Sequence, residues 1–116
     1  MKITKIMEIL DAEMLCGEHL KDTEIITACG CDLMSDVLAF VKEQCALITG
    51  LVNPQSIRTA MMMDMKCVIF VRGKRPDEKV VALANEHEIA ILSSTYTMFD
   101  ACGRLFENGM RGGGKV

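Results

Sequence analysis

The fold is indicated by residues 45–71, which read CALITGLVNPQSIRTAMMMDMKCVIFV. Residues 45–49 and 67–71 are almost entirely apolar, a pattern typical of strands that are covered on both faces of a sheet. Between them, Asn53 and the proline that follows it predict an N-cap and the first residue of a helix over 54–64. A strand, a helix and a strand joined by short loops predict a parallel βαβ unit.

The same alternation continues on both sides of this unit. Before it, we expect a helix over 4–10, strands over 12–17 and 24–29, and a helix that Asp32 caps and that runs to about Lys42. That last helix is inferred from Leu33, Val37 and Val41, which recur at four-residue spacing. After the unit, we expect a helix that begins at 76–78, a strand over 89–92, and a helix over 97–107 with Ser93, Ser94 and Thr95 as capping hydroxyls and Gly109 at its end.

These elements predict one α/β domain over residues 1–110. Alternating strands and helices favour a layered α/β/α sandwich with a mostly parallel central sheet. The chain has 116 residues, half of them apolar, which is enough for one hydrophobic core. The glycine-rich residues 111–116 are expected to form a flexible C-terminal tail.

Charge and composition argue against several classes of partner. The 13 basic and 16 acidic side chains are interspersed and give a net charge of −3, so no basic face for a nucleic acid is expected. No apolar run reaches the roughly 20 residues of a membrane span, and the N-terminus lacks the apolar core of a signal peptide. We therefore expect a cytoplasmic protein that binds neither nucleic acid nor membrane, with its six cysteines as free thiols.

Two motifs resemble chemical sites but have simpler explanations. Residues 109–115 match the glycine and lysine spacing of a phosphate-binding loop, yet a predicted helix precedes them and Val116 replaces the metal-binding hydroxyl. The cysteine pair in 29–31 would need two further metal ligands, for which His19 and His87 are the imidazoles at hand. We expect no metal, no cofactor and no catalytic residue.

The strongest candidate for a ligand site follows from the topology. Ligands of open parallel sheets bind beyond the carboxyl ends of the strands. The loops over 50–53, 72–75 and 93–96 should meet there and offer backbone N–H groups, hydroxyls and cations to an anion. Helix caps and solvated charges occupy the same positions in α/β proteins generally, so both interpretations are open at this point.

Residues 30–39, 47–55 and 68–76 together resemble a stand-alone DRTGG domain that spans about residues 1–110. The resemblance implies a layered α/β fold, dimerisation and an accessory or regulatory role. It also implies similarity to the N-terminal domain of HPr kinase/phosphorylase, here without the kinase domain. Domains of this kind occur inside some phosphotransacetylases and beside CBS domains, and small proteins of this type in anaerobic bacteria are often encoded near iron hydrogenase subunits.

Two functions follow as hypotheses. The first is a non-catalytic, homodimeric sensor that binds a small anionic metabolite or nucleotide at the strand ends. The second is an assembly subunit for a partner enzyme, such as an iron hydrogenase, that uses the methionine-rich residues 61–65 and the turn over 32–36 as protein contacts. An enzyme ranks third because no nucleophile and base occur at a motif spacing. The candidate ligand-binding residues are Asp32, Ser35, Asp36, Gly50, Asn53, Gln55, Arg72, Gly73, Lys74, Ser93, Ser94 and Thr95.

Overall fold

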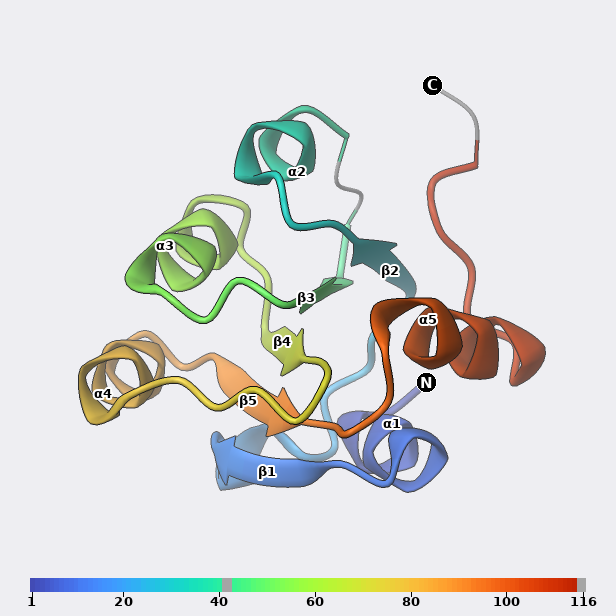
Figure 1. Cartoon of the computed structure of the whole chain (residues 1–116), viewed down its shortest axis with the longest axis horizontal. Helices are drawn as coiled ribbons and strands as arrows, with labels where there is room; N and C mark the ends of the chain where they lie inside the picture. The colour runs from blue at the N-terminus through green and yellow to red at the C-terminus, as the bar shows by residue number, and fades with distance from the viewer. Residues whose placement is uncertain (41–42, 115–116) are drawn as a thin grey trace.

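The computed structural model describes residues 1–40 and 43–114, in which a five-stranded sheet lies between two layers of helices (Figure 1). The strands are β1 (Glu13–Cys16), β2 (Thr27–Gly30), β3 (Cys45–Thr49), β4 (Cys67–Phe70) and β5 (Ala90–Ser93). They are arranged in the order β1-β5-β4-β3-β2, with β2 to β5 parallel and β1 antiparallel to β5. The predicted mostly parallel sheet is confirmed.

The helices divide unequally between the two faces of the sheet. One face is covered by α1 (Ile3–Leu10) and α5 (Met98–Glu107), and the other by α2 (Met34–Phe40), α3 (Pro54–Met62) and α4 (Glu78–Glu86). A short 3-10 helix, η1 (Glu18–Leu20), follows β1. The layered sandwich is confirmed, while the predicted end of α2 at Val41 and Lys42 lies outside the described residues.

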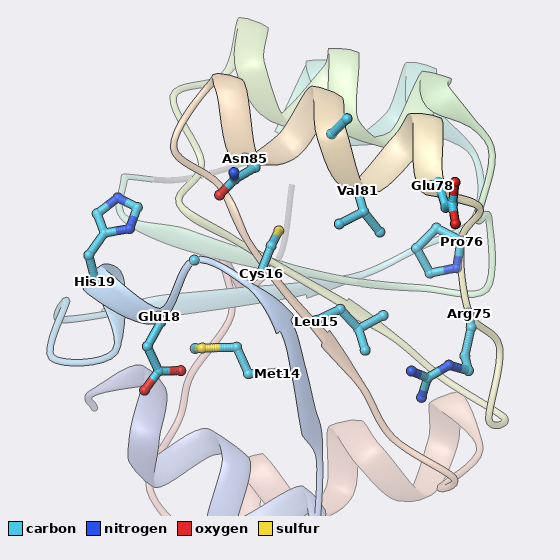
Figure 2. Close-up of a pocket in the computed structure, with 12 residues that line it drawn as sticks. Met14, Leu15, Cys16, Glu18, His19, Arg75, Pro76, Glu78, Val81 and Asn85 are labelled. Atoms are coloured by element: carbon cyan, nitrogen blue, oxygen red, sulfur yellow. The ribbon is translucent and has the colours of Figure 1, made fainter.

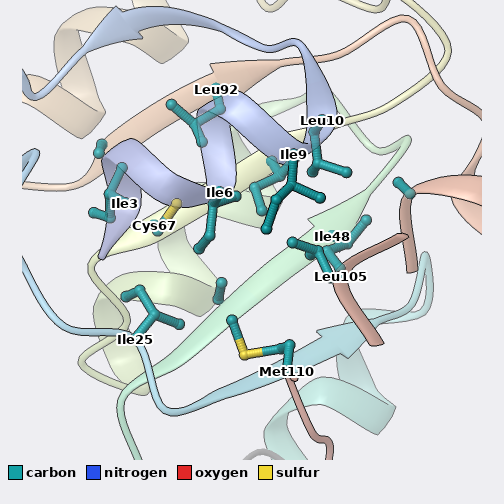
Figure 3. Packing of buried hydrophobic residues seen from close by; sticks show 14 of the residues in the cluster. Ile3, Ile6, Ile9, Leu10, Ile25, Ile48, Cys67, Leu92, Leu105 and Met110 are labelled. Carbon is teal, nitrogen blue, oxygen red and sulfur yellow. The ribbon is translucent and has the colours of Figure 1, made fainter. Parts of the chain in front are cut away.

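The three inner strands are buried along their whole length, which explains why their sequences are continuously apolar. Alternate side chains serve the two layers: Ile48 and Leu92 pack towards α1 and α5, as Figure 3 shows, and Leu47 packs towards the opposite layer. The core therefore consists of two apolar clusters separated by the sheet. In the described part of the chain, no helix combines the length and the apolar character that a membrane crossing requires.

Helix capping is predicted well where the cap is local. Asn53 Oδ1 accepts a hydrogen bond from the N–H of Gln55 at 2.9 Å, with proline at the first helical position as expected. Asp77 Oδ1 likewise accepts from the N–H of Val80 at 3.0 Å and begins α4. Both helices start where the sequence indicates because the capping side chain and its donor lie two or three residues apart.

Two predicted caps are wrong. Asp32 does not cap α2, which begins at Met34, because its carboxylate is bound by the loop after β3. The hydroxyls of residues 93–95 do not cap α5 either; Thr97 does, through a 3.3 Å hydrogen bond from the N–H of Asp100 to its Oγ1. In both cases a distant partner takes the side chain that the local pattern assigned to the helix.

The segment after α5 is attached to the edge of the sheet. The N–H of Ala28 donates to the carbonyl of Arg111 at 3.1 Å, and Thr27 and Arg111 form an isolated parallel bridge. The residue that begins the predicted tail is thus paired with β2, and the flexibility of 111–116 stays a prediction. This pairing covers part of an edge strand that would otherwise expose its backbone groups.

Gly17 follows β1 directly, and its substitution tests how closely this strand end packs against Ala90. Its φ is +88°, and an ideal Cβ would lie 2.5 Å from the Cα of Ala90. We expect Gly17→Ala to lower the free energy of unfolding by about 2–4 kcal/mol, from left-handed strain and overpacking together. Urea denaturation measures this difference. Gly103→Ala is the control, since nothing lies within 4 Å of its added Cβ, and equal midpoints for the two variants would contradict the expectation.

Candidate functional site

The loops that follow β4 and β5 are bound to each other at the carboxyl end of the sheet. The N–H of Arg72 donates to the carbonyl of Tyr96 at 2.7 Å, and the N–H of Gly73 donates to the carbonyl of Ser94 at 2.8 Å. We call this edge of the sheet, formed by the loops after β2, β3, β4 and β5, the rim. The expected convergence of the three loops is observed because their strands are adjacent and parallel.

A carboxylate connects the other two loops of the rim. Asp32, in the loop after β2, accepts hydrogen bonds through Oδ1 from the N–H of Gly50 at 2.7 Å and from the hydroxyl of Thr49 at 2.9 Å. Thr49 Oγ1 also accepts from the N–H of Leu51 at 3.1 Å. The donor expected for a bound anion is therefore already used by an anion of the protein itself.

Cations surround this carboxylate. The Arg72 guanidinium lies over Gly50, where an ideal Cβ would be only 2.6 Å from Nη2. Arg72 and Lys74 are exposed, and neither forms an ion pair with another described residue, whereas Arg75 pairs with Glu13. Arg72 also has a φ of +60°, a left-handed conformation that is uncommon for a residue other than glycine and that occurs at functional sites.

The same contacts hold the pKa of Asp32 below its ordinary value. The hydrogen bond from the Gly50 N–H is the main cause, and the Thr49 hydroxyl and the charges of Arg72 and Lys74 act in the same direction. Partial burial of the carboxyl opposes them. Asp32 is therefore ionised at neutral pH and bound in a field that favours negative charge.

Two of the hydroxyls predicted to bind a ligand, those of Ser93 and Ser94, already form hydrogen bonds within the protein. Ser93 Oγ donates to the carbonyl of Lys74 at 2.9 Å. Ser94 Oγ donates to the carbonyl of Leu10 at 2.8 Å and accepts from the N–H of Tyr96 at 3.3 Å. Both serines are buried, so they hold the loops in place, while Thr95 beside them is exposed.

The remaining predicted residues lie at the starts of helices. The side-chain oxygen of Asn53 accepts a hydrogen bond from the N–H of Gln55, and both residues are exposed. Ser35 and Asp36 are exposed in the first turn of α2. Within the described residues, no hydrogen bond or ion pair joins Ser35 or Asp36 to the cations of the rim.

Thr49 is the rim residue that sequence reasoning missed. It is fully buried at the last position of β3, and its hydroxyl bridges Asp32 to the start of the next loop. One signal could have identified it, namely a single hydroxyl at the end of an otherwise apolar strand and directly before Gly50. Such a buried polar group needs a partner.

A groove of about 720 Å³ adjoins the rim (Figure 2). It lies between β1 and α4, with apolar walls that include Leu15, Pro76 and Val81, and it extends from Arg75 to His19. This volume falls in the range of small-molecule sites. The groove could not be predicted because the sequence does not show that β1 is the edge strand beside β5.

Burial suppresses the ionisation of two of the thiols. Burial raises the pKa of Cys29 to about 11 and that of Cys67 to about 12, so both stay protonated at neutral pH. Over residues 1–40 and 43–114, no three His, Cys, Asp or Glu side chains are placed to hold a metal ion.

A family model described as the DRTGG domain matches residues 5–107. The chain belongs to the DRTGG domain family. Its fold is similar to a crystal structure of the CBS and DRTGG domains of the regulatory region of Clostridium perfringens pyrophosphatase, complexed with its activator diadenosine tetraphosphate. The TM-score is 0.74 at 17% identity, over 90% of this DRTGG chain and 45% of that chain. No curated protein sequence matches the chain.

At this identity the structural similarity establishes the fold of the DRTGG domain. The neighbour forms part of the regulatory region of its pyrophosphatase. The further likeness to the N-terminal domain of HPr kinase/phosphorylase stays a prediction.

A substitution of Asp32 tests whether its carboxylate stabilises the folded protein through the contacts with Thr49 and Gly50. We expect Asp32→Asn to lower the free energy of unfolding by about 1 kcal/mol at pH 7, because a neutral amide accepts the Gly50 N–H less strongly and the site is partly exposed. The folded-state pKa of Asp32 lies below its ordinary value of 3.8, so this contribution is complete above that pH and is lost as the pH falls through the folded pKa.

The measurement is urea denaturation of both proteins between pH 7 and pH 2. Asp22→Asn serves as the control because Asp22 is also exposed and lies in a loop at the other end of the molecule from the rim. A difference between wild type and Asp32→Asn that persists undiminished at the acid end would contradict the assignment.

Proposed function

We propose that this DRTGG domain is a non-catalytic, homodimeric sensor that binds a small anionic metabolite or nucleotide at the rim. The observation that carries the proposal is the pair of exposed cations, Arg72 and Lys74, which have no ion-pair partner among the described residues. They lie beside a backbone N–H of Gly50 that already binds a carboxylate. Charge-assisted hydrogen bonds of this kind are the strong ones in anion recognition.

In this proposal, displacement of Asp32 couples ligand binding to a structural change in the protein. A phosphate that approaches Arg72 enters the field that now stabilises the Asp32 carboxylate, so the two anions compete for the Gly50 N–H. When the ligand displaces the carboxylate, the loop between β2 and α2 loses its side-chain attachment to Thr49 and Gly50 and keeps the backbone hydrogen bond from Cys31 to Ile48. Binding is then coupled to the position of α2, because the ligand favours one of two arrangements of that loop.

The neighbour supports the chemistry of this ligand. Its regulatory region is complexed with a dinucleoside polyphosphate, which combines several anionic groups with two nucleosides. In this chain the apolar groove begins at Arg75, next in sequence to Lys74, and could receive a nucleoside whose phosphates lie at the rim. An anion alone would use the cations and leave the groove empty.

A second function is favoured by one surface feature. Met62 is 71% exposed on α3, and Met61 and Met63 beside it are half-buried. A methionine-rich surface of this kind adapts readily to a protein partner. An assembly subunit that uses it would return a stoichiometric partner enzyme on purification from its host, and its stability would not respond to small anions.

Ligand binding is tested by calorimetry and thermal unfolding with diadenosine tetraphosphate, ATP and inorganic pyrophosphate. A ligand of the native state raises the melting temperature by mass action. We expect Arg72→Ala and Lys74→Ala each to weaken binding by about tenfold, the loss of one charge-assisted contact. Lys21→Ala, an exposed lysine in the loop after η1, should bind as the wild type does.

The ligands separate two modes of recognition. Equal affinity for pyrophosphate and ATP would support a sensor of phosphate groups, and a preference for the nucleotides would support a part for the groove. The proposal is overturned if none of the three raises the melting temperature, or if Lys21→Ala weakens binding as much as Arg72→Ala does.

A further inference from the structure

The outer face of α5 carries exposed aromatic side chains. Phe99 is 85% exposed and Phe106 is 59% exposed, and the two lie seven residues apart, on the same side of the helix. The core side of α5 is separate from this stripe and is formed by Ala101 and Leu105. Figure 1 shows that α5 and α1 together cover one face of the sheet, with no further element outside α5 in the described chain. Exposed aromatic groups of this size mark interaction surfaces.

A hollow lies directly beside Phe99. It has a volume of about 500 Å³ and is lined in part by Gly103, whose added Cβ would have no neighbour within 4 Å. Phe99 forms one wall of the hollow, and the other walls are formed by Tyr96, Asp100, Arg104 and Glu107. The face therefore presents a bulky knob at one position and an empty hole four residues later.

We infer that this face of α5 binds the same face of a second copy of the chain, with the two helices antiparallel about a two-fold axis. Contacts across a two-fold axis use one surface twice, so the surface must be complementary to itself. A knob and a hole side by side meet this condition, because each Phe99 then enters the hollow over Gly103 of the other copy. This inference names the surface of the proposed homodimer and does not require a ligand at the rim.

The charges on the face fit the same arrangement. In antiparallel helices that bring position 99 opposite position 103, Asp100 of one copy lies within one turn of Arg104 of the other, and the pair occurs twice. Arg104 is already oriented, since its Nε donates to the carbonyl of Ile9 at 3.0 Å and its guanidinium lies 4.5 Å from the centre of the Tyr96 ring. Antiparallel helix dipoles add to the complementarity.

Exposed apolar side chains also occur elsewhere in the described chain. On the opposite layer they are Met62 on α3 and Leu33 and Leu38 at α2, and the ring of Phe106 is already covered on one side by the Arg111 guanidinium, 4.0 Å from its centre. A helix of ten residues is about 15 Å long, so the dimer buries less than a standard interface and should dissociate at roughly micromolar concentrations.

The test is sedimentation equilibrium over a range of protein concentrations from about 1 µM to 500 µM, which brackets weak association. The wild type should form a reversible dimer. Phe99→Ala, which leaves two holes, and Gly103→Phe, which sets two knobs against each other, should each raise the dissociation constant at least tenfold. Met62→Ala, on the opposite layer, should leave it unchanged.

The double variant Phe99→Ala with Gly103→Phe distinguishes a specific contact from nonspecific hydrophobic association. It exchanges knob and hole, and in the antiparallel arrangement each knob again meets a hole, so association should return to within a few-fold of the wild type. Thermal unfolding of each variant confirms that it is folded.

Three outcomes would overturn the inference in distinguishable ways. A wild type that stays monomeric removes the homodimer altogether, and the α5 face then serves another partner. A dimer that neither single variant weakens keeps the homodimer and moves its surface elsewhere. If the double variant associates as weakly as the single variants do, the two-fold pairing of Phe99 with Gly103 is rejected.

Discussion

The parallel alignment of β2, β3, β4 and β5 is the constraint on which the rest of the molecule depends. Each of these strands enters the sheet from the same side, so the loops that follow them all leave at one rim. Because the inner strands are buried on both faces, little but these loops can present polar groups at that edge. Asp32 then becomes the neighbour of Gly50, although 18 residues separate them. A local choice of strand direction thereby creates a site for negative charge.

The protein fills that site with its own carboxylate, and the two cations beside it form no ion pair with a residue that the structure describes. This arrangement explains why Arg72 tolerates a left-handed backbone: its N–H is bound by Tyr96 and its guanidinium covers Gly50. The two layers of helices also differ. Three of the four rim strands lead into the layer of α2, α3 and α4, while β5 leads into α5, which lies with α1 in the layer that leaves an aromatic face exposed. In the two proposals, the layer of α2, α3 and α4 responds to the bound ligand, and the layer of α1 and α5 contacts the second copy of the chain.

Sequence reasoning succeeded where the causes are local. The buried strand over 45–49 and the cap at Asn53 depend on neighbours within a few residues, and both are confirmed. It failed where a side chain has a distant partner: Asp32 is held across 18 residues, and Ser94 donates to Leu10 across 84 residues. Convergence of the rim loops could be predicted from the alternation of elements. The β1 groove and the exposure of Phe99 could not, because they depend on the position of an edge strand and on which side of α5 meets the sheet.

The most direct measurement is an NMR titration of the nitrogen-15-labelled protein with diadenosine tetraphosphate. If the ligand competes with Asp32, the backbone amide of Gly50 should show one of the largest shifts, together with the amides of Arg72 and Leu33. The amides of the last turn of α5, residues 105–107, should move little, because this end of the helix lies farthest along the chain from the rim loop over 93–96. Shifts that concentrate on α5 while Gly50 stays unmoved would contradict the account.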